Sequence, residues 1–167
     1  THGNIIHNQK LIKNAFQQSQ ESILVGWLPF YHDMGLIGNI LHPAYLGARS
    51  ILMSPVHFLQ KPSRWLEAIC KYRATTSGGP NFSFELCINK ISEEKRLDLD
   101  LSCWNVAFCG AEPVNSSTLS NFAIAFKSKG FNANAFQPCY GMAEATLLIS
   151  AVKHNSGLTV TRFKEKD

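Results

Sequence analysis

Short apolar runs alternate along the chain with longer segments in which apolar residues recur at every third or fourth position. Short runs of this kind are typical of buried strands, whereas the longer period is typical of helices with one buried face. The predicted strands span residues 22–29, 49–54, 74–80, 103–110 and 133–138, and the predicted helices span residues 34–47, 61–72, 81–91, 115–130 and 142–153. Strand–helix alternation repeated about five times predicts one compact α/β unit, in which helices flank a mostly parallel sheet.

Chemically distinctive turns follow most of the predicted strands. In open parallel sheets, ligands bind in the crevice beyond the carboxyl ends of the strands. The turns at such ends read LPFYHDMG (28–35), SGGPN (77–81), CGAEPV (109–114) and PCYGMAE (138–144). We therefore expect these turns to share one edge of the sheet and to form the functional site there.

The first of these turns places His32 and Asp33 at a strand-to-helix junction. Asp33 alone is explained as a helix cap that complements the helix dipole. His32 is either a buried structural histidine or part of a site, because imidazole titrates near neutrality and binds anions.

The second and third turns are rich in small residues. In the second, Gly79, Pro80 and Asn81 precede a helix, whose free N–H groups favour anions, although the spacing and the lysine of a phosphate loop are lacking. In the third, the small residues of CGAEPV would let a flat ring lie against the backbone. A plain tight turn remains an alternative explanation for each.

The fourth turn, YGMAEAT (140–146), combines a flat aromatic ring, a glycine and a carboxylate. Tyr140 could stack on a planar ligand, and Glu144 could hold Mg²⁺, which prefers oxygen ligands and bridges phosphates. The alternative is that Tyr140 belongs to the core and that Glu144 is an ordinary carboxylate in the first turn of a helix.

Composition excludes several classes of function. Of the 167 residues, 45% are apolar and 17% are charged, and the net charge of +4 is scattered, which argues against a nucleic-acid surface. No apolar run reaches the roughly 18 residues that a membrane span needs. The five cysteines form no CxxC pair, which predicts free thiols in a reducing compartment, namely the cytoplasm. The six histidines show no metal-binding spacing.

Taken together and in this order, the motifs resemble those of the acyl-adenylate-forming superfamily, and most of all those of the fatty acyl-AMP ligases. The resemblance extends from Thr1 to about Val152. It is carried by THGN (1–4), GWLPFYHDMGLIG (26–38), SGGPNFSFELC (77–87), LDLSCWNVAFCGAEPV (99–114) and FQPCYGMAEATL (136–147).

The resemblance implies a role for each motif. The adenine ring of ATP would lie between Tyr140 and the segment Gly110, Ala111, Glu112 and Pro113. The remaining implied positions are Gly141 and Met142 near the sugar and phosphate, Glu144 at Mg²⁺, His32 beside the acyl carboxylate, and Gly79, Pro80 and Asn81 along the acyl or pantetheine channel. Much of the superfamily has threonine immediately before that glutamate, whereas this chain has Ala143, as fatty acyl-AMP ligases commonly do.

The resemblance also implies a reaction and its partners. A fatty carboxylate would attack the α-phosphate of Mg·ATP, pyrophosphate would leave, and the acyl group of the acyl-adenylate would pass to an acyl carrier protein or a polyketide synthase module. The alternatives are an acyl-CoA ligase and a degenerate module that binds acyl chains or nucleotide without turnover. Residues 1–167 would form the middle of an adenylation domain, with the phosphate loop upstream and a C-terminal domain downstream. The fragment alone is then expected to be inactive.

Overall fold

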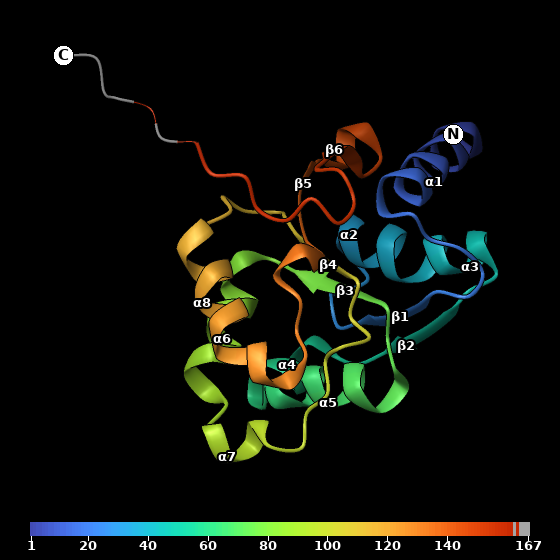
Figure 1. Ribbon diagram of the computed structural model, residues 1–167. Coiled ribbons are helices and arrows are strands. Elements are labelled where there is room, and N and C mark those ends of the chain that lie inside the picture. Colours follow the sequence, from blue (N-terminus) through green and yellow to red (C-terminus); the bar gives the residue numbers. More distant parts are fainter. Residues whose placement is uncertain (162, 164–167) are drawn as a thin grey trace.

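A six-stranded sheet forms the centre of the chain in a computed structural model that describes residues 1–161 and 163 (Figure 1). The strand order is β2-β1-β3-β4-β5-β6; the first five strands are parallel, and β6 is antiparallel to β5. The strands are β1 (Ile23–Gly26), β2 (Arg49–Leu52), β3 (Thr76–Gly79), β4 (Val106–Cys109), β5 (Phe136–Gly141) and β6 (Leu148–Ala151). The predicted α/β fold with a mostly parallel sheet is confirmed.

Helices cover both faces of this sheet. They are α1 (His2–Phe16), α2 (Asp33–Leu36), the π-turn η1 (Ile37–Leu41), α3 (His42–Leu46), α4 (Pro55–Gln60), α5 (Ser63–Tyr72), α6 (Asn81–Lys90), α7 (Glu93–Arg96) and α8 (Ser116–Phe126), with 3₁₀ turns η2 (Lys127–Lys129), η3 (Ala133–Ala135) and η4 (Ala143–Ala145). Strand order reverses between β1 and β3, and crossovers between parallel strands are right-handed. The segment α2–α3 therefore lies with α1 on one face, whereas α4 to α8 cover the other (Figure 1).

The face covered by α4 to α8 holds a dense aromatic core. Trp104 is 1% exposed, and its ring centroid lies 5.4 Å from that of Trp65 and 5.2 Å from that of Phe131. Its indole N–H donates to the carbonyl of Val106 at 2.9 Å, so the buried polar atom is satisfied. This core fixes the positions of β3, β4 and β5, whose carboxyl ends carry the distinctive turns.

The prediction of a helix over residues 142–153 is wrong. Residues Ala143–Ala145 form a single 3₁₀ turn, and Leu148–Ala151 form β6, which pairs with β5 as a hairpin. The backbone N–H of Met142 donates to the carbonyl of Leu147 at 2.9 Å and closes this hairpin. An apolar run of this length fits either a strand or a helix, and pairing with a neighbouring strand decides between them.

Two further differences concern the ends of elements. The last parallel strand begins at Phe136 and not at residue 133, since Ala133–Ala135 form a 3₁₀ turn. Helix α6 begins at Asn81, as predicted, and ends at Lys90, one residue before the predicted end. The predicted helix over 34–47 is confirmed as α2, η1 and α3 in succession.

Helix α1 was not predicted from the sequence. Its buried residues are Asn8, Gln9, Ile12 and Phe16, which recur at helical spacing but include two polar amides. Apolar periodicity is the main sequence signal for a helix, so a helix whose buried face is half polar is not predicted from it.

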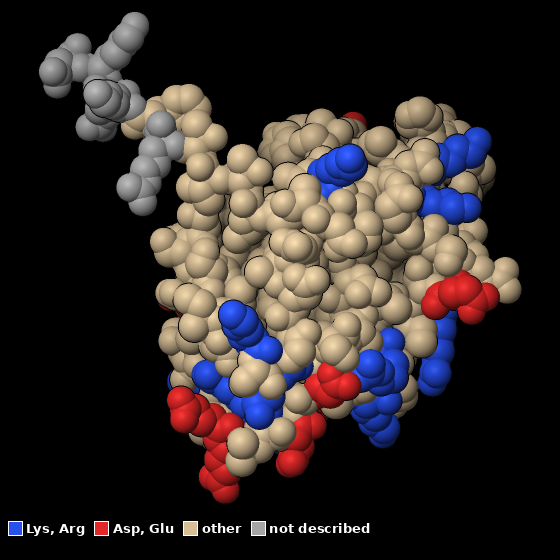
Figure 2. Space-filling model, in the orientation of Figure 1, with Lys and Arg blue, Asp and Glu red and all other residues tan. Residues whose placement is uncertain are grey.

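Acidic and basic residues are mixed on the surface of the described residues, as the scattered charge of the sequence predicts. In Figure 2, acidic and basic side chains lie close together at the lower edge of the view, where α7 contributes Glu93, Glu94, Lys95 and Arg96. Within residues 1–161 and 163, no helix has the length and apolar character needed to cross a membrane. All five cysteines are free, as predicted, and Cys87 and Cys109 are buried.

Candidate active site

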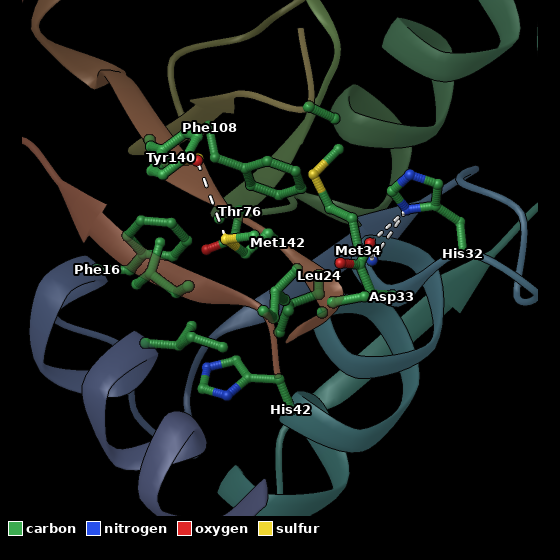
Figure 3. A pocket seen from close by; sticks show the side chains of 18 of the residues that line it. Phe16, Leu24, His32, Asp33, Met34, His42, Thr76, Phe108, Tyr140 and Met142 are labelled. Carbon is green, nitrogen blue, oxygen red and sulfur yellow. Dashed lines mark hydrogen bonds and ion pairs between the residues drawn. The ribbon is translucent and has the colours of Figure 1, made fainter. Parts of the chain in front are cut away.

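A cavity of about 430 Å³ lies between the sheet and the helices α1 and α2–α3 (Figure 3). It is situated where the strand order reverses, which is the usual ligand position in open α/β sheets. Strands β1 and β3 are in register there at one position, Leu24 opposite Thr76, and both of these residues line the cavity. The crevice therefore opens where the two strands diverge.

The cavity has an exposed mouth and a buried interior. Tyr31 and Tyr140 at the mouth are 95% and 59% exposed. Leu24 and Ile12 on the inner walls are each 3% exposed. The apolar residues that line the walls are Ile12, Phe16, Leu24, Met34, Phe108, Leu147 and Leu148. A cavity with these walls is suited to an elongated apolar group that enters with a polar end outward.

Glycine at position 78 makes room for one of these walls. The Phe108 ring on β4 lies against the backbone of Gly78 on β3, where an added Cβ would come within 2.5 Å of the ring. An added Cβ would also meet the Phe108 carbonyl oxygen at 2.1 Å, so only glycine lets β3 and β4 pack this closely with the ring in place.

The first turn supplies a histidine oriented by a carboxylate. The Nδ1 atom of His32 lies 2.6 Å from Oδ1 of Asp33, and the same oxygen accepts the backbone N–H of Met34 at 2.6 Å. Nδ1 of His32 also accepts the backbone N–H of Met34 at 3.1 Å, so the Asp33 carboxylate and this N–H together fix the orientation of the ring. The Nε2 atom of His32 remains available at the mouth of the cavity (Figure 3).

The predicted capping position is occupied by the neighbour of Asp33, since the N-cap of α2 is His32, whose ring accepts the N–H of Met34. Asp33 is the first residue of α2, where its carboxylate complements the helix dipole and accepts the same N–H. The Met34 N–H is therefore shared between the His32 ring and the Asp33 carboxylate, which ties both side chains to the start of α2.

Two hydrogen bonds join the segments that follow the second and third turns, beside the cavity. Glu112 accepts the backbone N–H of Phe82 at 2.6 Å, and Asn81 accepts the backbone N–H of Asn115 at 2.9 Å. Ala111 adopts a left-handed conformation with φ of 69°, which is uncommon for a residue with a side chain, and it lines the cavity mouth. The cavity lining does not include the other predicted residues of these turns, which are Gly79, Pro80, Asn81, Gly110, Glu112 and Pro113.

The fourth turn brings the predicted aromatic ring and carboxylate to the same edge. Tyr140, Gly141, Met142 and Ala143 line the mouth, and the Tyr140 hydroxyl contacts the Met142 sulfur at 4.0 Å (Figure 3). Glu144 is the next residue after Ala143; it lies within η4 and is exposed. Gly141 lies tightly against the returning strand, since an added Cβ would meet the carbonyl of Leu147 at 2.0 Å.

No cluster of three or more candidate metal ligands occurs among residues 1–161 and 163. Mg²⁺ is commonly held by one or two carboxylates together with substrate phosphates, and not by an all-protein cage. A single exposed carboxylate beside an open cavity mouth, as Glu144 is, fits that mode of binding.

A buried asparagine that the sequence analysis did not single out holds this turn in place. Asn8 on α1 is 5% exposed; its amide oxygen accepts the N–H of Leu148 at 3.0 Å, and its amide nitrogen donates to the Leu148 carbonyl at 2.8 Å. Between Glu144 and Leu148, Thr146 is strained, with φ of 78° and ψ of −64°. The contacts of Asn8 help to maintain that conformation.

Replacing Asn8 by Ala is expected to cost about 1–3 kcal/mol of folding free energy, because it leaves buried backbone groups of Leu148 without partners. In the folded full-length protein it should also lower the rate of pyrophosphate release, because Glu144 would lose its fixed position. Urea unfolding and the initial rate of pyrophosphate release measure the two effects. Asn14→Ala, at an exposed position of the same helix, is the matched control and should change neither.

Residues 1–163 match the family described as AMP-binding enzyme. The chain belongs to this family. The match covers every turn described above, so the cavity and its mouth are features of an AMP-binding enzyme.

Similar proteins are longer than this chain. A medium-chain fatty acid–acyl carrier protein ligase of Teredinibacter turnerae is 51% identical over 156 residues, which are 93% of this chain and 24% of that protein. A probable long-chain fatty acid–AMP ligase of Mycobacterium tuberculosis is 38% identical over 166 residues, 96% of this chain and 28% of that protein. The chain thus spans about a quarter of the length of these relatives.

Solved structures show the same fold. The crystal structure of a fatty acyl-adenylate ligase from L. pneumophila, in complex with acyl adenylate and pyrophosphate, is 50% identical and superposes with a TM-score of 0.92. The superposition covers 94% of this chain and 28% of that protein. The arrangement of the AMP-binding fold around the cavity is therefore shared with an enzyme that holds an acyl-adenylate.

Of the predicted site residues of this AMP-binding enzyme, His32, Ala111, Tyr140, Gly141 and Met142 line one cavity mouth. Glu144 is adjacent to that mouth through Ala143. Two neighbouring loops, joined by hydrogen bonds, contain Gly79 to Asn81 and Glu112 to Pro113. The proposed roles of these residues remain predictions.

Proposed function

We propose that the protein to which this chain belongs activates a fatty acid with ATP, forming a fatty acyl-adenylate and pyrophosphate. The observation that carries the proposal is the deep apolar cavity, whose open mouth gathers an oriented histidine, an exposed tyrosine ring and an adjacent carboxylate. The relatives named as fatty acid ligases and the neighbour solved with an acyl adenylate support it.

The cavity would receive the acyl chain, and its mouth would receive the nucleotide. An apolar chain that leaves water for the walls gains roughly 0.8 kcal/mol per buried methylene. The adenine ring would lie between Tyr140 and the segment Gly110–Pro113, where the left-handed backbone at Ala111 keeps the side chain from the ring. This division places the acyl carboxylate at the mouth, beside the α-phosphate.

The residues at the mouth would position the reacting groups and neutralise charge. With Nδ1 held by Asp33, Nε2 of His32 would contact an oxygen of the carboxylate or phosphate. Glu144 is the residue that would hold Mg²⁺. A bound Mg²⁺ ion stabilises charge on the phosphates. Gly79, Pro80 and Asn81, at the adjoining loop, would border the route of the pantetheine arm.

The proposed acceptor is an acyl carrier protein, either free or within a polyketide synthase module. The relative from Teredinibacter turnerae is named as a ligase with such an acceptor. Five free cysteines favour a reducing compartment, so we place the enzyme in the cytoplasm.

Product analysis with the full-length enzyme tests the proposed function. The enzyme is incubated with Mg·ATP, dodecanoic acid and excess CoA, and the acyl products are identified by mass spectrometry. Acyl-AMP that persists beside CoA and disappears when a pantetheinylated carrier protein is added agrees with the proposal. Acyl-CoA as the main product would instead assign the enzyme to the acyl-CoA ligases. A lack of any adenylate would indicate a non-catalytic module.

A further inference from the structure

The floor of the cavity ends in polar side chains, although its walls are apolar. Gln18, His42 and Thr76 all line the cavity and are 5%, 1% and 2% exposed. In Figure 3, His42 lies on the opposite side of the cavity from Tyr140 and Phe108. A group that enters past Tyr140 therefore has His42 on the far side of the cavity.

These side chains form one continuous chain of hydrogen bonds. Nδ1 of His42 lies 2.5 Å from the side-chain oxygen of Gln9, and Nε2 lies 2.8 Å from that of Gln18. The Gln18 amide nitrogen in turn donates to the hydroxyl of Thr76 at 3.0 Å. The network links α1, the loop that follows it, α3 and β3, so its members hold one another in place.

The imidazole in this network is neutral. Burial, followed by the charge of Lys13, lowers the pKa of His42 to about 4. A neutral imidazole carries a single N–H, so it donates to one of the two glutamine oxygens that face its ring nitrogens. The network is a set of neutral hydrogen bonds that an apolar group cannot replace, and separating them would leave buried polar atoms without partners.

We propose that His42, together with Gln18, closes the acyl cavity and restricts the substrate to fatty acids whose terminal methyl group stops short of this pair. The inference rests on the proposed function and specifies its substrate class as acids of limited chain length. A longer chain would have to push its methyl end into the hydrogen-bonded network or leave methylenes outside the cavity. His42 acts here as a specificity determinant and takes no part in the chemistry at the mouth.

Chain-length profiles of the full-length enzyme test the proposal. The value of kcat/KM for pyrophosphate release is measured with octanoic, dodecanoic and hexadecanoic acids. Wild-type values should rise roughly fourfold per methylene while the chain still fills the cavity, and then fall. The His42→Ala variant removes the closing ring, and its ratio of hexadecanoic to dodecanoic activity should increase by at least about tenfold, which is less than two further methylenes would contribute.

Two further variants keep the test decisive. His42→Asn shortens the side chain but retains an amide for the neighbouring glutamines, so it reports on the proposal even if His42→Ala fails to fold. Asn39→Ala removes a polar side chain that is 2% exposed, one turn earlier in the same helical segment and outside the cavity lining. It should leave the ratio unchanged.

An unchanged ratio in a folded His42 variant, judged by its thermal melting, overturns the proposal while the proposed function stands. If the wild-type enzyme activates none of the three acids, the proposed function fails and the chain-length limit fails with it. A ratio that rises in the His42 variants and not in Asn39→Ala supports the proposal.

Discussion

Replacing Glu144 by Gln in the full-length enzyme is expected to lower the rate of pyrophosphate release by at least about 100-fold, as removal of a charge-stabilising group at an active site commonly does. Glutamine has nearly the same shape but lacks the negative charge that would hold Mg²⁺ beside the phosphates. The side chain is exposed, so its charge makes little contribution to folding. The thermal melting curve of the variant should therefore remain close to that of the wild type.

The matched control is Glu85→Gln, which makes the same change of charge at an exposed position on α6, outside the cavity lining. Its rate of pyrophosphate release should equal that of the wild type. If Glu144→Gln instead unfolds, and its activity falls in proportion to the folded fraction, Glu144 is a structural carboxylate and the assigned role is wrong.

Replacing Trp104 by Ala is expected to destabilise the fold by about 3–5 kcal/mol, the usual cost of truncating a fully buried aromatic side chain. The ring is 1% exposed and lies within 5.4 Å, centroid to centroid, of Trp65. The change also removes the indole donor from the carbonyls of Val106 and Ser77. Because Ser77 and Val106 belong to β3 and β4, the loss would loosen the strands that carry two of the turns.

Urea unfolding followed by circular dichroism measures this cost, with the free energy taken from the midpoint and slope of the transition. Trp104→Phe retains a six-membered aromatic ring and removes the pyrrole part of the indole with its N–H, so it should cost clearly less than Trp104→Ala. A loss below about 1 kcal/mol for Trp104→Ala would show that the core tolerates the cavity, contrary to the values usual for buried aromatics.

The sequence predicted the parts of the fold that local chemistry determines. The apolar runs of β1 and β4 and the distinctive turns after β1, β3 and β4 are read directly, because parallel strands buried on both faces are almost continuously apolar. The turn residues His32, Ala111 and Tyr140 could therefore be assigned to one edge of the sheet, and the structure brings them to one cavity mouth.

The remaining features depend on contacts between distant residues. β6 looked helical because its pairing with β5 is not visible in the run itself. Helix α1 escaped notice because Asn8 and Gln9 are buried only through their partners at Leu148 and His42. Likewise, His42 falls within a correctly predicted helix, but its position at the floor of a cavity follows only from the packing of α3 against α1 and β3.

A crystal structure of the full-length enzyme with a non-hydrolysable dodecanoyl-adenylate analogue would locate the adenine ring and the acyl chain together. We expect the adenine ring to contact Tyr140, and the acyl chain to run past Met34 and Phe108 and to end before His42. An acyl chain outside this cavity, or an adenine ring remote from Tyr140, would show that the proposed site is wrong.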